Sequence, residues 1–205
     1  MNLHALGVFS LLISLPSPVE QSLRELAKEG LGTQNSLSVV LPVVTVGDLL
    51  ETSELILHGR IGHSATRLTS NDSIVVTDYA ILPIRIFKQT KVTGVAAQPG
   101  PTNPIVVTIA GGTVVDGEHR LTTIVNLYPA SEMFRVSEEV FLFLVFDPTE
   151  KTFLLNGGPF GAFRVTDGSV LPMTKSVTSR RGDVLVSTVE FMGDVGQRLQ
   201  ARPRR

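Results

Sequence analysis

The chain has no cysteine, so its candidate metal ligands and general bases begin with four histidines: His4, His58, His63 and His119. His58 and His63 are five apart on one expected strand, where alternation puts them on opposite faces unless a bulge intervenes. His119 lies in an expected tight turn, and no HExxH motif is present. The spacing therefore predicts no metal site. The lack of cysteine also excludes thiolate zinc sites, iron–sulfur clusters, disulfide scaffolds and a cysteine nucleophile.

No pattern in the chain points to a serine nucleophile, because the G-x-S-x-G motif is absent. Asp147 and Glu150 flank an expected turn, where we expect solvated carboxylates rather than a glycosidase pair. The glycine pairs at 111–112 and 157–158 are not followed by Lys-Ser or Lys-Thr and open no expected helix, so they are not phosphate loops. We therefore predict no catalytic residue and no bound cofactor, and the sequence favours a protein that is not an enzyme.

Composition narrows the class of partner. The 205 residues carry a net charge of −1, with 42% hydrophobic and 18% charged residues, which excludes a disordered chain. Binding of single-stranded nucleic acid needs a basic groove with aromatic stacking platforms. The chain has no tryptophan and only two tyrosines, Tyr79 and Tyr128, and its basic residues are scattered. We predict no nucleic-acid partner.

The N-terminal run from Ala5 to Leu15 is apolar but too short to span a bilayer, so we predict no transmembrane segment. Its length fits the hydrophobic region of a secretory signal. No basic residue precedes it, the first being Arg24, and no A-x-A cleavage site follows it. A degenerate export signal and a buried N-terminal segment therefore both stay open. We expect an extracytoplasmic location, with the cytoplasm as the alternative.

Helices are expected at both ends of the chain. Ser17 as N-cap, Pro18 and Glu20 predict a helix that ends near Gly30. A second, amphipathic helix is predicted from Asp183 to Leu199. The expected organisation is an N-terminal extension over 1–38, a β-barrel domain over 39–175, and a C-terminal helix with a basic tail over 176–205.

Between these helices the chain is rich in β-branched residues, with Val, Ile and Thr at 55 of 205 positions. Glu54–Leu68 and Ile74–Lys88 predict a long hairpin, in which glycines at 59 and 62 indicate bulges and Pro83 indicates an edge or bulge. Glu139–Phe146 is apolar throughout, which predicts a central strand. Further strands are expected at 105–110, 113–115, 119–125, 152–156 and 161–165, and one helical turn at 48–53. Six to seven strands in a meander fit a small closed barrel, with an open sandwich as the alternative.

Three stretches carry a family resemblance: SELILHGRI at 53–61, FRVSEEVFLFL at 134–144 and GAFRV at 161–165. Their order is similar to that of poorly characterised bacterial exported β-barrel domains. Those domains in turn resemble the OB-fold of netrin-like and metalloproteinase-inhibitor modules. The resemblance covers about residues 43 to 166, and it implies a closed or partly open OB-like barrel with no catalytic residues.

The chain departs from this pattern at Ser137, where the family has a turn glycine. It also lacks the N-terminal cysteine through which the inhibitors reach a protease zinc, so that mechanism is not carried over. We expect a non-enzymatic β-barrel module for protein interaction or an accessory role. Its expected contact loops are Val92–Pro104 and Asn126–Glu132. The alternative is a small-ligand carrier or hydrolytic enzyme with a pocket at the barrel mouth near His58, Arg60 and Tyr79.

Overall fold

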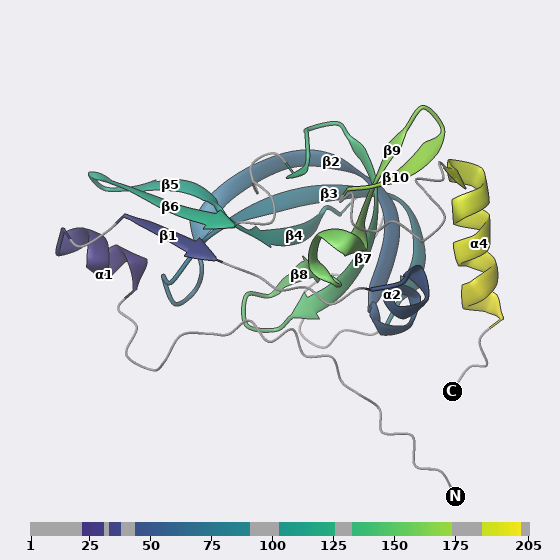
Figure 1. Cartoon of the computed structure of the whole chain (residues 1–205), viewed down its shortest axis with the longest axis horizontal. Helices are drawn as coiled ribbons and strands as arrows, with labels where there is room; N and C mark the ends of the chain where they lie inside the picture. Colours follow the sequence, from purple (N-terminus) through teal and green to yellow (C-terminus); the bar gives the residue numbers. More distant parts are fainter. Residues whose placement is uncertain are drawn as a thin grey trace, which may run out of the picture.

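The computed structural model describes residues 22–30, 33–37, 44–90, 103–125, 133–173 and 186–201, and the side chains of 186–189 are not described. The described chain is mainly β, as predicted. Figure 1 shows two long curved strands through the middle of the molecule, a small sheet with α1 at one end and α4 at the other. The helices are α1 (Leu23–Lys28), α2 (Val46–Thr52) and α4 (Thr188–Gln200), with a short 3₁₀ turn η1 (Gly158–Gly161).

The larger sheet closes partly into a ring. Its order is β11-β10-β9-β7-β2-β3-β4-β8, and an additional pairing of β7 with β8 joins five of these strands in a circle. All pairs in the ring are antiparallel except β4 with β8, which is parallel. The strands of this sheet are β2 (Leu55–Leu68), β3 (Val75–Gln89), β4 (Ile105–Ala110), β7 (Glu139–Asp147), β8 (Thr152–Leu155), β9 (Ala162–Thr166), β10 (Ser169–Pro172) and β11 (Val186–Ser187).

The ring has five strands rather than the six to seven predicted. The difference arises because β5 (Gly112–Asp116) and β6 (His119–Val125), predicted as part of the barrel, leave it and pair with β1 (Gln34–Leu37) in a second sheet. In that sheet β1 runs parallel to β6, and α1 packs on it through Leu23 and Ala27. The predicted boundary at residue 39 stays a prediction, although α1 and β1, on its N-terminal side, contact β6.

The long hairpin of β2 and β3 forms as predicted and bends at bulges. The pairing shifts register between Ile56 and Leu57, between His58 and Gly59, and between Ile61 and Ser64. Pro83 faces Gly59 beside one of these shifts. The carbonyl of Val75 accepts from the amide of Gly111 on the β4 side. Because backbone groups alternate sides along a strand, the backbone nitrogen of Pro83 also faces the β4 side. The pairing with β4 ends at Ile81, however, so the absence of an N–H in proline breaks no hydrogen bond of the ladder.

Two apolar layers lie on the two faces of the ring. The interior cluster fills the inside of the ring with side chains from every ring strand, among them Leu57, Tyr79 and Leu142. The outer cluster lies beneath α2 and α4 and includes Phe141, Phe143 and Val195. The apolar strand predicted at 139–146 is therefore central, because its alternate residues enter both clusters.

Capping explains where two helices begin. Ser22 caps α1 and accepts from the amide of Glu25, whose carboxylate accepts from the Ser22 amide in return. Thr45 and Asp48 form the same capping box at α2. The predicted start of the first helix at Ser17 lies outside the described residues. The C-terminal helix is confirmed, although its predicted first residue, Asp183, also lies outside them, and two residues of β11 directly precede the helix.

Candidate functional site

Two of the three residues predicted for a pocket meet on the outer face of the ring. His58 Nε2 lies 3.2 Å from Glu139 Oε2, and the guanidinium of Arg60 donates to Glu139 Oε1 at 2.7 Å. We call these three residues the His58 cluster. The two basic side chains come from alternate positions of β2, and the carboxylate comes from the first residue of β7, which pairs with Arg60. The sequence predicted His58 and Arg60 near one pocket, but it did not indicate Glu139.

Burial sets the electrostatics of the His58 cluster. His58 is 8% exposed, and desolvation lowers the pKa of its imidazole below the usual value; the nearby Glu139 carboxylate opposes this effect, and Arg60 adds to it. The bond from Arg60 lowers the pKa of Glu139, against the opposing effect of burial. At neutral pH the cluster therefore holds a neutral imidazole beside an Arg–carboxylate pair.

Tyr79 lies apart from His58 and Arg60. It is 2% exposed in the interior cluster, where its ring meets Phe134 edge-on at 5.1 Å between centroids. Burial raises the pKa of the Tyr79 hydroxyl, while a hydrogen bond with the Phe134 backbone lowers it in part. Because His58 alternates along β2 with the interior Leu57, it points away from Tyr79. The structure thus brings together two residues of the predicted pocket and not the third.

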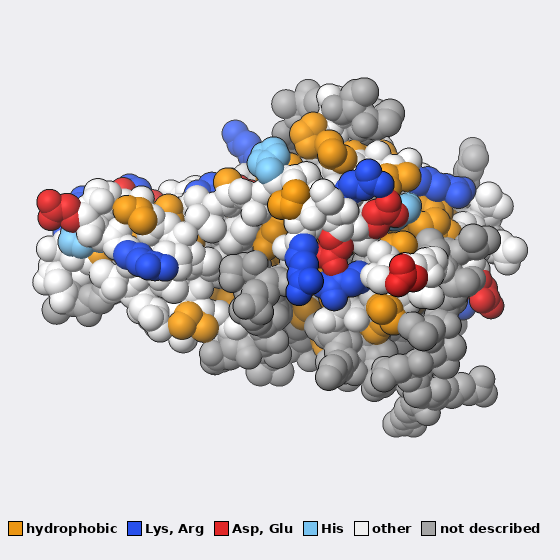
Figure 2. All heavy atoms as spheres, turned by 90° about the horizontal axis from the view of Figure 1, so that it is seen from above, with side chains coloured by type: hydrophobic (Ala, Val, Ile, Leu, Met, Phe, Trp, Pro, Cys, Tyr) orange, Lys and Arg blue, Asp and Glu red, His pale blue; other side chains and the backbone are white. Residues whose placement is uncertain are grey.

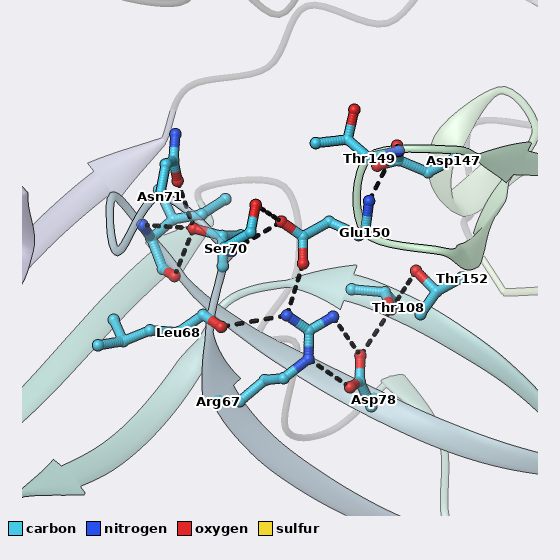
Figure 3. Close-up of polar contacts among 12 residues, drawn as sticks. Arg67, Leu68, Ser70, Asn71, Asp78, Thr108, Asp147, Thr149, Glu150 and Thr152 are labelled. Atoms are coloured by element: carbon cyan, nitrogen blue, oxygen red, sulfur yellow. Dashed lines mark hydrogen bonds and ion pairs between the residues drawn. The ribbon is translucent and has the colours of Figure 1, made fainter.

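A second polar cluster, centred on Arg67, was not predicted. Figure 3 shows the Arg67 guanidinium between the carboxylates of Asp78 and Glu150. Arg67 Nε donates to Asp78 at 2.7 Å, and another guanidinium nitrogen donates to Glu150 at 2.6 Å. The amide and hydroxyl of Ser70 both donate to the other Glu150 oxygen, at 2.8 and 2.7 Å. The expectation of a merely solvated turn at Glu150 is wrong, since its side chain is only 11% exposed and holds two strand ends together.

The Arg67 cluster continues through hydroxyls to the next strands. Thr108 donates to Asp78 at 2.6 Å, and its hydroxyl lies 2.8 Å from that of Thr152. Burial lowers the pKa of Arg67, but its bonds to Asp78 and Glu150 more than reverse the effect, so the pKa is raised. Glu150 shows the same balance with opposite sign. Burial raises the pKa of its carboxyl, and the hydrogen bonds from Ser70 and Arg67 bring this pKa below the usual range. The cluster joins β2, β3, β4 and β8, so its arrangement suits closure of the ring.

A third surface feature is apolar. Leu82 and Ile84 of β3 and Val106 of β4 are 43%, 49% and 39% exposed. They share the outer face of the ring, because Val106 pairs with Ala80, Leu82 is two residues further along β3, and Ile84 is the extra residue of the bulge opposite His58. We call these three residues the outer strip. In Figure 2, a view from above, hydrophobic side chains reach the surface among charges of both signs.

The second sheet carries an open groove of about 550 Å³. Arg24 lines it and is already held by Asp116 at 2.6 Å and Asp72 at 2.9 Å. His119 also lines it, which places this predicted turn residue beside the loop glycine, Gly117. Two cations, Arg24 and Lys28, and two carboxylates, Asp116 and Glu118, line the groove, so its formal charges balance and it offers little net charge to a ligand.

Several expectations fall outside the residues that the structure describes. These are the N-terminal apolar run, the loop Asn126–Glu132 and nearly all of the loop Val92–Pro104. Within the described ranges, no three His, Asp or Glu side chains group as a metal site. No helix in those ranges is long and apolar enough to cross a membrane.

Comparison with protein-family models, with curated proteins and with solved structures found no match.

Proposed function

We propose that the protein is a non-enzymatic binding module in which an OB-like barrel presents its outer strip to a partner protein. The order of the ring supports the OB-like assignment: β2 pairs with both β3 and β7, while β8 joins β7 and runs parallel to β4. These connections are the ones expected of a five-stranded, partly open Greek-key barrel, which supports the proposal. Export of the chain stays a prediction.

The observation that carries the proposal is the exposure of the outer strip. On the same face of the ring, α2 and α4 cover the large apolar side chains of the outer cluster, such as Phe141. The strip continues this apolar surface, but Leu82 and Ile84 keep between two fifths and half of their surface in water. A run of large apolar side chains on a rigid sheet is typical of an interaction surface.

The polar clusters support binding rather than catalysis. Each carboxylate of the Arg67 cluster is engaged by arginine and hydroxyl donors, and Glu139 of the His58 cluster is held by Arg60. A general base needs a lone pair directed at a substrate. The alternative, a carrier or hydrolase, needs a pocket lined by His58, Arg60 and Tyr79 together. Because His58 and Arg60 point away from Tyr79, these three side chains do not line one pocket.

Site-specific photocrosslinking in the cells that make the protein tests this function. Benzoylphenylalanine replaces Ile84 in one chain and Val115 of β5 in a matched chain. Val115 is 72% exposed, so it is more accessible than Ile84 but lies on the second sheet. We expect a discrete protein adduct from position 84 that is absent from position 115. The same adducts from both positions, or none from position 84, contradict the proposal.

A further inference from the structure

The outer strip is bordered by basic side chains. Arg60 pairs with Leu82 across the strands, and its side chain is 53% exposed although it binds Glu139. Arg85 is exposed at the bulge beside Ile84, with its guanidinium 4.6 Å from the centroid of the Phe87 ring. Among the residues that the structure describes, Arg85 forms no ion pair with a carboxylate. A partner that covers the strip therefore meets the guanidinium of Arg85, which no carboxylate of the described residues holds, and the exposed part of Arg60.

The backbone of β3 makes an added strand unfavourable as the occupant. Beyond Ile81, β3 has no paired neighbour on the β4 side within the described residues. Such an open edge can accept an extended peptide. Here, however, Pro83 is buried rather than open to solvent, and its backbone supplies no N–H to a ladder on that side. Proline on an edge strand is a common obstacle to further pairing.

The same face already binds a helix of this chain. The ring centroid of Phe191 in α4 lies 5.1 Å from that of Phe141 and 5.3 Å from that of Phe163. Val195 of α4 is fully buried. Phe87, beneath Arg85, packs in the same cluster. The surface on which α4 packs thus extends to β3, next to the outer strip. The outer face of the sheet can therefore accommodate a helix that lies across its strands.

From these observations we propose that the outer strip binds an amphipathic helix of the partner, with Asp or Glu on the flank that faces Arg60 and Arg85. The apolar side of the helix covers Leu82, Ile84 and Val106. Its carboxylates pair with Arg85 and with the exposed part of Arg60, which adds orientation and specificity. This inference rests on the proposed binding function and names the chemistry of the partner.

Designed peptides test the inference on the full-length protein. Three peptides of about 18 residues share one apolar stripe, since shorter helices are marginal in water. Their flanks carry Glu, Gln or Lys, and a fourth peptide is the Glu version with two central prolines. Each carries a tryptophan, whose fluorescence anisotropy reports binding selectively because the protein has none.

We expect the Glu helix to bind about tenfold more tightly than the Lys helix at low salt, with a difference that shrinks as salt is added. Arg85→Gln should weaken the Glu helix about threefold and leave the Gln helix unchanged, because a single rim ion pair contributes modestly. The double variant L82D/I84D should bind none of the peptides, whereas V115D should bind as the wild type does. Circular dichroism checks that each variant is folded.

Three results overturn the inference. Equal affinities for the Glu and Lys helices would show that the outer strip does not select an acidic partner. Equal affinities for the Glu helix and its proline version indicate an extended partner. Binding that survives L82D/I84D lies elsewhere on the protein. If photocrosslinking succeeds at position 84 while the Glu helix fails to bind, the partner chemistry is wrong and the binding function stands.

Discussion

The hydroxyls of Thr108 and Thr152 lie 2.8 Å apart, across the seam where β4 meets β8. The backbones of these two strands pair in register at one position only, Val107 with Phe153. The Thr108 hydroxyl also contacts Asp78 of the Arg67 cluster. Side-chain bonds therefore supplement a short ladder at the point where the ring of five strands closes.

Removal of the Thr108 hydroxyl should open this seam. Thr108→Val keeps the shape of the side chain but leaves Asp78 and Thr152 without that partner in a buried site. We expect a loss of about 1–3 kcal/mol in the free energy of unfolding, measured by urea titration. The matched change Thr166→Val, at an exposed position of β9, should alter stability by less than about 0.5 kcal/mol. Equal effects of the two substitutions would show that the seam does not depend on this hydroxyl.

Acid should weaken the Arg67 cluster through Glu150. The folded pKa of this carboxyl is lowered from its ordinary value of 4.5, so the folded state binds fewer protons than the unfolded state. Its contribution to stability is complete above pH 4.5 and is lost as the pH falls through the folded pKa. Glu150→Gln should flatten the acid limb of a stability–pH curve, whereas Glu118→Gln, in an exposed turn, should not. An unchanged acid limb in Glu150→Gln would refute the assignment.

His58 should produce a separate pH dependence at milder acidity. Its folded pKa is lowered from 6.5, so stability is complete above pH 6.5 and falls as the pH drops towards the folded pKa. His58→Gln should remove this slope, and His63→Gln, at an exposed position, should retain it. NMR titration of the imidazole gives the pKa directly. A His58 pKa above 6.5 would reverse the predicted sign.

Gly59 should tolerate no side chain. A Cβ at this position would lie 2.8 Å from Ile81 Cγ2 and 2.9 Å from the backbone oxygen of Leu82. Gly59→Ala should therefore cost about 1–3 kcal/mol by overpacking the bulged hairpin. In α4, Gly196 has open space around its Cα, so Gly196→Ala should stabilise the protein by up to about 1 kcal/mol. Thermal unfolding distinguishes the two, and a neutral Gly59→Ala would mean that the hairpin shifts to make room.

Local pattern predicted much of the fold. The β2–β3 hairpin, its bulges and the central β7 follow from alternation, glycine placement and a run of apolar residues, all of which lie within short windows. The strands β1, β10 and β11 were missed, since they have two to four residues each and are defined by the strands beside them. Their pairing is a tertiary property that short-range periodicity does not contain.

The polar sites were harder to predict. Arg67 and Glu150 are 83 positions apart, and His58 and Glu139 are 81 apart, so no spacing rule connects them. The outer strip was also missed, because Ile84 reaches the surface through the bulge that interrupts alternation on β3. An exposed apolar residue of this kind is recognisable only once the pairing of its strand is known.

The most direct test of the binding module is the affinity of the partner identified by crosslinking at position 84. Its dissociation constant is measured against the wild type, L82D/I84D and V115D, each confirmed as folded by its thermal transition. We predict at least a tenfold weaker complex for L82D/I84D, about 1.4 kcal/mol or more, and an unchanged complex for V115D. Equal affinities for the wild type and L82D/I84D would contradict the assignment of the outer strip as the binding surface.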